Sequence, residues 1–170
     1  DITFGAQVAG EIDSDPASFP VLDSATHVKA YAHLERITNN VLNSGKLNYR
    51  DEFTWRTRII EDDSVLNAFC TPGGYIYVYT GLIKFLDSED QLAGVMGHEI
   101  AHADERHSTE ALTKQYGTEV LFAVLFGSEP GVLAQVAKGM LSLQYSRSNE
   151  SESDMRSVEY LYETEYDARG

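Results

Sequence analysis

The residues with the clearest chemical potential lie at positions 98 to 102, where the chain reads His98-Glu99-Ile100-Ala101-His102. Two histidines four residues apart lie one above the other on a single helix face, so both imidazoles can bind one tetrahedral zinc ion. The Glu99 carboxylate then lies beside the metal, where it can take a proton from a zinc-bound water whose pKa falls to about 7. The pattern therefore predicts a metal site at which Glu99 acts as a general base.

A catalytic zinc site of this type needs a third protein ligand, and one common extension of the motif is absent. That extension requires a glycine at position 105 and a histidine at position 108, whereas the chain has Glu105 and Ser108. His107 lies five residues past His102, about 140° further round the same helix. We therefore expect His107 to have a structural role or to contact a ligand residue, rather than to bind the metal itself.

A glutamate from a later helix is the other common source of the third ligand. The segment YSRSNESESD, residues 145–154, contains Glu150 and, four residues later, Asp154. This spacing lets Glu150 bind zinc while Asp154 accepts the free ring N–H of a ligand histidine. Three protein ligands leave the fourth zinc position open for water, as catalysis requires. Glu152 is the alternative ligand, but it lies on a different helix face, where we expect it to be solvated.

Length and composition place these residues in one ordinary domain. The chain has 170 residues, 42% of them hydrophobic and 24% charged, and no apolar run reaches the roughly 18 residues that cross a bilayer. Lys and Arg number 13 against 27 Asp and Glu, a formal net charge of −14, which argues against nucleic acid as a partner. The single cysteine, Cys70, excludes an intrachain disulfide and a CxxC metal site.

Hydrophobic spacing and turn residues predict the elements that must position the site. Ser88-Glu89-Asp90-Gln91 is a capping box that begins the histidine-bearing helix, which we expect to continue to about residue 113. Residues 65–81 predict a hairpin around a Thr71-Pro72-Gly73-Gly74 turn, with the alternating tyrosines of its second strand on a packed aromatic face. The further elements that we expect are a loosely ordered lead-in at 1–24 with one short helix, an amphipathic helix at 25–42, a strand at 53–60, a short helix at 82–86, buried helices at 120–126 and 130–145, and a charged last helix at 149–163.

Three stretches, LNAFCTPGGYIYVYTGLI, QLAGVMGHEIAHADERHS and YSRSNESESD, together resemble the HtpX-like and CaaX prenyl protease family of zinc metalloendopeptidases, in its soluble branch from bacterial envelopes. The resemblance covers residues 30–170. It implies an α+β, minimal zincin-like fold, in which a small, mostly antiparallel sheet packs on the active-site helix. Carried over by position, it implies His98, His102 and Glu150 as ligands of one zinc ion, Glu99 as catalytic base, and Asp154 as the residue that orients a ligand histidine.

The same resemblance implies a biological setting. We expect a metallopeptidase domain at 25–170 that hydrolyses unfolded or extended polypeptides in envelope protein quality control, in the bacterial periplasm or cell envelope. We also expect further sequence beyond Gly170, and peripheral or lipid-anchored membrane association of a longer protein. In folds of this type an edge strand near the zinc pairs with extended substrate, and residues 67–71 are the candidate strand.

The chain departs from the family pattern at two positions. Ser153 and Ser157 stand where the family usually has alanine and glycine, so the packing of that helix can differ. The NExxSD pattern at Asn149–Asp154 also fits thermolysin-like secreted proteases, but Glu150 follows His102 by 150 − 102 = 48 positions, a longer interval than in those enzymes. The longer interval favours the first family.

Two questions stay open on the sequence alone. Outside the proteases, the alternative function is a non-proteolytic chaperone or binding module that keeps a structural zinc. The group that stabilises the oxyanion is not assigned, because Tyr145, Arg147 and His107 are each candidates.

Overall fold

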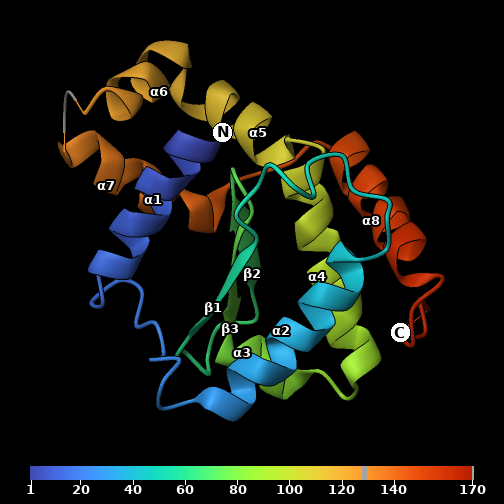
Figure 1. Cartoon of the computed structure of the whole chain (residues 1–170). Helices are drawn as coiled ribbons and strands as arrows, with labels where there is room; N and C mark the ends of the chain where they lie inside the picture. Colours follow the sequence, from blue (N-terminus) through green and yellow to red (C-terminus); the bar gives the residue numbers. More distant parts are fainter. Residues whose placement is uncertain (128–129, 170) are drawn as a thin grey trace.

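The computed structural model describes residues 1–127 and 130–169, and in this part of the chain it shows an α+β fold, which confirms the expected fold class (Figure 1). A small sheet stands in the middle of the molecule with helices on both sides. The elements of the described residues are α1 (Ile2–Ser14), α2 (Val28–Leu42), β1 (Arg56–Ile60), β2 (Ala68–Thr71), β3 (Tyr75–Tyr79), α3 (Thr80–Phe85), α4 (Glu89–Asp104), α5 (His107–Tyr116), α6 (Thr118–Leu125), α7 (Pro130–Gly139), the 3₁₀ turn η1 (Met140–Ser142) and α8 (Arg147–Leu161).

The sheet has the strand order β1-β3-β2 and is mixed. β1 runs parallel to β3, whereas β2 and β3 form the expected antiparallel hairpin. Gly73 and Gly74 turn this hairpin with φ angles of 81° and 86°, in the left-handed region that glycine adopts readily. The sheet is therefore half parallel rather than mostly antiparallel, and β2 is an edge strand.

The central strand β3 divides the molecule into two cores, because its side chains alternate between the two faces of the sheet. Ile76 and Val78 face the core that contains α2 and α4, whereas Tyr75, Tyr77 and Tyr79 face the core that contains α1 and α7. All five side chains are buried. The predicted aromatic face of this strand is thereby confirmed.

The expectation of a loosely ordered lead-in is wrong for residues 2–14, which form the regular helix α1. Phe4, Val8 and Ile12 recur every fourth residue along one face, and all three are buried in the core beside the sheet. Gly5 allows the helix to approach the hairpin turn, since a Cβ at this position would lie 1.7 Å from the Pro72 carbonyl oxygen. Gly5 therefore serves close packing rather than a turn.

The histidine-bearing helix begins as predicted but ends earlier. The Ser88 hydroxyl caps it by accepting a hydrogen bond from the Gln91 backbone N–H at 3.3 Å. The helix stops after Asp104, and Arg106 takes a left-handed conformation with φ of 62° before α5 begins at His107. A single helix to about residue 113 is therefore wrong, because this one residue redirects the chain.

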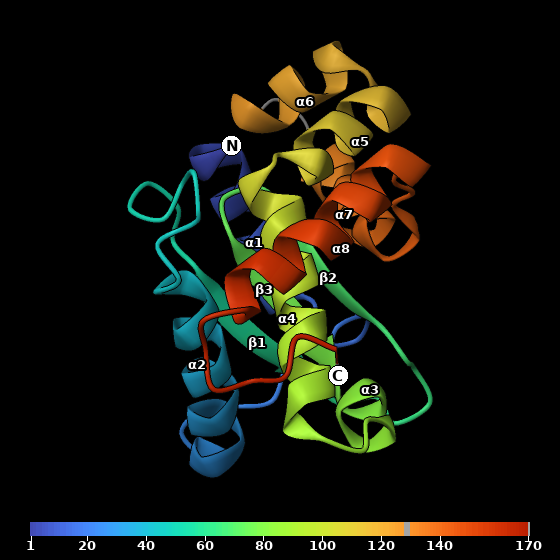
Figure 2. The ribbon, with the colours of Figure 1, turned by 90° about the vertical axis from the view of Figure 1, so that its right-hand side faces the viewer.

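The two apolar helices that follow are less buried than expected. In α6 only Val124 is buried, and the stacked rings of Phe122 and Phe126 are exposed. The helix expected over 130–145 is α7 and η1, which end at Ser142, and of these only the later part, from Val136 to Met140, is mostly buried. α6 lies at the outer end of the molecule in both views, whereas α7 packs beside α1 (Figures 1 and 2).

The last helix, α8, crosses α4 and packs closely against it (Figure 2). Gly97 makes this approach possible, since a Cβ there would lie 2.5 Å from the Ser157 hydroxyl. Ser157 in turn donates a hydrogen bond to the Gly94 carbonyl oxygen at 2.9 Å. Ser157 therefore adds a hydrogen bond between α8 and α4 while the two helices remain closely packed.

Candidate active site

Three side chains from α4 and α8 converge at one point. His98 and His102 lie on one face of α4, and their Nε2 atoms approach to 2.9 Å. Glu150, in the first turn of α8, places one carboxylate oxygen 3.5 Å from His98 Nε2 and the other 3.7 Å from His102 Nε2. One atom from each residue lies within 4.8 Å of the other two, a spacing that could hold a metal ion. The structure thus brings together the three residues expected as ligands.

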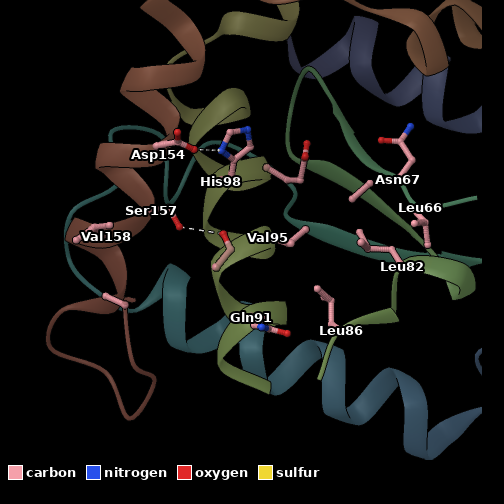
Figure 3. Close-up of a pocket in the computed structure, with 14 residues that line it drawn as sticks. Leu66, Asn67, Leu82, Leu86, Gln91, Val95, His98, Asp154, Ser157 and Val158 are labelled. Carbon is pink, nitrogen blue, oxygen red and sulfur yellow. Dashed lines mark hydrogen bonds and ion pairs between the residues drawn. The ribbon is translucent and has the colours of Figure 1, made fainter. Parts of the chain in front are cut away.

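The start of α8 is set locally, which fixes where Glu150 points. The Ser146 hydroxyl caps the helix by accepting the Asn149 backbone N–H at 3.1 Å. Asp154 lies one turn after Glu150, and its carboxylate is 2.8 Å from His98 Nδ1 (Figure 3). Because Nε2 of His98 faces Glu150, a proton on Nδ1 donates to Asp154. The role expected for Asp154 agrees with this contact.

His102 is the more enclosed of the two histidines. Its side chain is 1% exposed, against 24% for His98. The Tyr145 ring stacks on it with 3.8 Å between ring centroids. Burial, and then the neighbouring histidines His98 and His107, lower the pKa of His102 to about 3. His102 is therefore neutral over the physiological range, which is the form that binds a metal.

Glu99 lines two cavities, one together with His98 and the other together with His98, His102 and Glu150. The Glu99 residue is partly buried. Burial, and then the charge of Glu150, raise the pKa of Glu99 to about 8 in the metal-free chain. A positive ion among His98, His102 and Glu150 would oppose this rise by favouring the carboxylate. Glu99 can therefore bind and release a proton near neutral pH.

A cleft of about 660 Å³ opens beside His98 and Glu99 (Figure 3). Its sides come from the segment before β2, from α3 and its end, and from α4 and α8. The apolar side chains that line it are those of Leu66, Leu82, Leu86, Val95 and Val158. A second, smaller cavity of about 230 Å³ is lined by the convergent His98, His102 and Glu150, by Glu99, and by Met140, Leu141, Leu143 and Tyr145. Asn67 and Ala68 line both cavities, so the start of β2 runs past the convergent side chains.

The outer edge of β2 faces these cavities. The register pairs Ala68 with Val78 and Cys70 with Ile76, and the Tyr79 N–H donates to the Asn67 carbonyl oxygen. In an antiparallel ladder the bonded and non-bonded pairs alternate, so the backbone N–H groups of Ala68 and Cys70 point away from β3. The Cys70 carbonyl oxygen accepts the Ser108 hydroxyl at 3.1 Å. Ala68 thus presents an outward N–H and C=O beside His98 and Glu99.

Two of the candidates for stabilising an oxyanion are engaged elsewhere. The Tyr145 hydroxyl lies 3.1 Å from the Ser108 hydroxyl, and its ring covers His102. His107 is buried among α4, α5 and α8. Arg147 is exposed at the first position of α8.

Sequence reasoning missed the environment of His107 and Glu152. His107 Nδ1 lies 3.1 Å from His102 Nδ1, and His107 Nε2 lies 3.2 Å from a Glu152 carboxylate oxygen. The expected separation of 140° round one helix does not apply, because the chain turns at Arg106. Glu152 is therefore bonded to a buried histidine, although its side chain is 46% exposed.

The fold and the convergent residues together define a zincin-like metallopeptidase domain. Residues 28–170 match Peptidase family M48. Mitochondrial metalloendopeptidase OMA1 of Arabidopsis thaliana is 32% identical over 123 residues, which cover 72% of this chain and 25% of that protein. Metalloprotease YcaL of Escherichia coli is 27% identical over 146 residues, 81% of this chain and 53% of that protein. A putative beta-barrel assembly-enhancing protease of Vibrio cholerae is 36% identical over 119 residues, 62% of this chain and 25% of that protein.

The chain belongs to Peptidase family M48, because the match covers most of its length. This confirms the family resemblance that the three sequence stretches indicate. The chain spans about a quarter to a half of the length of these relatives. Helix α1 precedes the matched residues. Among the described helices, none combines the length and the apolar character that crossing a bilayer would take.

Proposed function

We propose that the chain is a zinc-dependent metalloendopeptidase domain that cleaves extended polypeptides. The observation that carries the proposal is the convergence of His98, His102 and Glu150, whose potential ligand atoms lie within 4.8 Å of one another. Two imidazoles and one carboxylate are a donor set that zinc prefers, and three protein ligands leave a position for substrate or water. Membership of a metallopeptidase family supports the same assignment.

The residues divide the work of hydrolysis. Zinc at this site would supply a Lewis acid that polarises the scissile carbonyl and lowers the pKa of water. Glu99 takes one proton from the attacking water as the new C–O bond forms, and passes it to the leaving nitrogen as the C–N bond breaks. His98, His102 and Glu150 hold the metal, and Asp154 orients His98 by accepting its Nδ1 proton.

Extended substrate is expected to bind along β2. An added strand would pair with the outward N–H and C=O of Ala68, which places its backbone across Glu99. The apolar walls formed by Leu82, Leu86 and Val95 would then receive a bulky apolar side chain next to the scissile bond. We therefore expect unfolded or extended proteins, rather than folded ones, to be cleaved.

Envelope protein quality control, in a bacterial periplasm or envelope, is the biological role that we propose. Its support is the similarity to a beta-barrel assembly-enhancing protease and to metalloprotease YcaL. Peripheral or lipid-anchored membrane association of a longer protein belongs to the same proposal. A thermolysin-like secreted protease is set aside, because the chain belongs to a different family.

Metal content and hydrolysis of an unfolded protein test the proposal together. Elemental mass spectrometry of the purified chain should find about one zinc per chain, and Glu150→Ala, purified in parallel, should contain less. The wild-type chain should cleave unfolded casein, and Glu99→Gln should lose this activity by at least about 10³-fold while retaining zinc.

Two outcomes would overturn the assignment. A wild-type chain that takes up no zinc even when zinc is supplied would contradict the metal site. A chain with one zinc that hydrolyses no unfolded protein would instead favour a non-proteolytic chaperone or binding module, whereas full activity in Glu99→Gln would exclude Glu99 as the base.

A further inference from the structure

A series of hydrogen-bonded side chains leads from His102 to the surface. The His107 ring is 3% exposed and lies at the first position of α5, immediately after the left-handed Arg106. Its Nδ1 is 3.1 Å from His102 Nδ1, and its Nε2 is 3.2 Å from a Glu152 oxygen. Both nitrogens of a buried imidazole therefore have partners, one on α4 and one on α8.

The hydrogen bonds in this series all donate in one direction, from His102 through His107 to Glu152. His102 Nε2 faces His98 and Glu150, so it must be unprotonated to bind a metal, and the proton of the neutral ring then lies on Nδ1. His107 Nδ1 is the acceptor for that proton. The neutral His107 ring consequently carries its own proton on Nε2, from which it donates to the Glu152 carboxylate.

Ser153 also lies near His107, with its hydroxyl oxygen 3.2 Å from His107 Nδ1. It does not replace His107 as the partner of His102, because among the described residues the hydrogen-bonding side chain at His102 Nδ1 is that of His107. A serine hydroxyl can rotate, so Ser153 can share this acceptor or donate elsewhere.

We propose that His107 is a positioning residue that, together with Glu152, fixes the tautomer and ring orientation of His102. This inference rests on the proposed zinc site. The Asp154 carboxylate contacts His98 directly. His102 instead contacts His107, and His107 contacts the Glu152 carboxylate, which lies on α8 like Asp154. α8 would thus supply one metal ligand, Glu150, and the carboxylate at the end of each histidine's bond.

The break between α4 and α5 is what makes this bridge available. Arg106 turns the chain so that His107 returns toward His102 instead of continuing along α4. The Arg106 side chain is held by Asp1, with 2.6 Å between Arg106 Nε and an Asp1 oxygen. The left-handed residue is therefore held by Asp1, the residue before α1, as well as by its neighbours.

Zinc affinity of the purified chain, measured by competition with a chromophoric chelator, tests the proposal. His107→Phe keeps a buried ring but removes the acceptor, so we expect zinc affinity to fall about 10- to 100-fold. His107→Asn offers an amide oxygen near the position of Nδ1, and it should recover most of that loss. Glu152→Ala, which changes a half-exposed residue, should weaken zinc binding by a smaller factor.

A matched control separates positioning from packing between α5 and α8. Glu110 on α5 accepts a hydrogen bond from the Asn149 amide of α8 at 3.1 Å, outside the histidine chain. Glu110→Ala should therefore bind zinc like the wild type. In long-range ¹H–¹⁵N spectra of the metal-free wild type, His102 should carry its proton on Nδ1, and in the metal-free His107→Phe protein this preference should be lost.

The outcomes distinguish this inference from the proposed function. Wild-type zinc affinity in both His107→Phe and Glu152→Ala would overturn the inference and leave the zinc site intact. Equal losses in Glu110→Ala and Glu152→Ala would also overturn it, since packing alone would then explain them. A wild-type chain without zinc would contradict the proposed function itself. If His107→Phe does not fold, the comparison of Glu152→Ala with Glu110→Ala decides the question.

Discussion

The three residues that converge on the proposed metal position differ in how firmly they are held. His102 is enclosed by the Tyr145 ring and by His107, whereas Glu150 has 47% of its side chain exposed. The position of Glu150 depends on the docking of α8 rather than on packing around its own side chain. At the residue scale, His102 is thus held by the side chains packed around it, whereas Glu150 is not.

Tyr145 gives a direct residue-scale test of what this enclosure does. Its hydroxyl bonds to Ser108 and its ring stacks on His102, so Tyr145→Phe should keep the stacking and lose one hydrogen bond. We expect kcat within about threefold of the wild type and a loss of about 1 kcal/mol in the free energy of unfolding. Steady-state kinetics and urea unfolding measure the two quantities.

The same variant decides whether Tyr145 stabilises the oxyanion. Loss of an oxyanion donor typically lowers kcat by about 10²- to 10³-fold. A fall of that size in Tyr145→Phe, with zinc content unchanged, would show that the hydroxyl leaves Ser108 when substrate binds. Tyr145→Ala is the companion variant, because it also removes the ring that covers His102.

At the element scale, β2 is the strand along which we propose that extended substrate binds. The outward N–H of Ala68 can be removed without breaking the ladder to β3, because proline is tolerated where the N–H is not used. Phe69 is a poorer site for this change, since it pairs with Tyr77 in the ladder and is buried. We expect Ala68→Pro to lower kcat/KM for an extended peptide about threefold to tenfold, the value of one hydrogen bond.

The measurement needs a control for the side chain itself. Ala68→Ser keeps the backbone N–H, so it should retain more activity than Ala68→Pro, with equal zinc content in both. Equal kcat/KM in the wild type and a folded Ala68→Pro would argue that peptides do not pair with this edge of β2.

The elements also show what the sequence could and could not predict. The start of α4 follows from the Ser88 cap, and helix geometry places His98 and His102 on one face of it. The sequence also named Glu150 and Asp154, and the structure brings both beside these histidines. Their role as ligands and orienting residue stays a prediction. The end of α4 depends on a left-handed Arg106, and nothing in the residue type predicts that conformation.

The contact between His107 and Glu152 could not be predicted, because it requires knowing how α5 and α8 pack. Helix periodicity describes one helix at a time, so it placed Glu152 in solvent. Asn149 and Glu152 both reach α5 from the first turns of α8. The packing of α5 against α8 therefore determines which charged side chains of α8 contact buried residues.

At the scale of the whole molecule, the sheet holds two cores in place, and only one of them contains α4. The other is built from α1, α7 and the tyrosine face of β3, and α1 lies before the residues that match the family. Arg56 of β1 links this side by an ion pair with Asp13 at 2.6 Å, and Asp13 also accepts the Tyr77 hydroxyl at 3.1 Å. The position of β2 beside the site thus depends on support from α1 behind the sheet.

Two glycines of α1 test this dependence within a single helix. A Cβ at Gly5 would meet the Pro72 carbonyl oxygen at 1.7 Å, whereas a Cβ at Gly10 would meet no atom within 4 Å. Alanine favours a helix over glycine by up to about 1 kcal/mol at either position. We expect Gly10→Ala to raise the free energy of unfolding by up to that amount, and Gly5→Ala to lower it by about 1 to 3 kcal/mol, because overpacking outweighs propensity. Urea unfolding of both variants measures the difference, and stabilisation by both would mean that α1 does not pack on the hairpin turn.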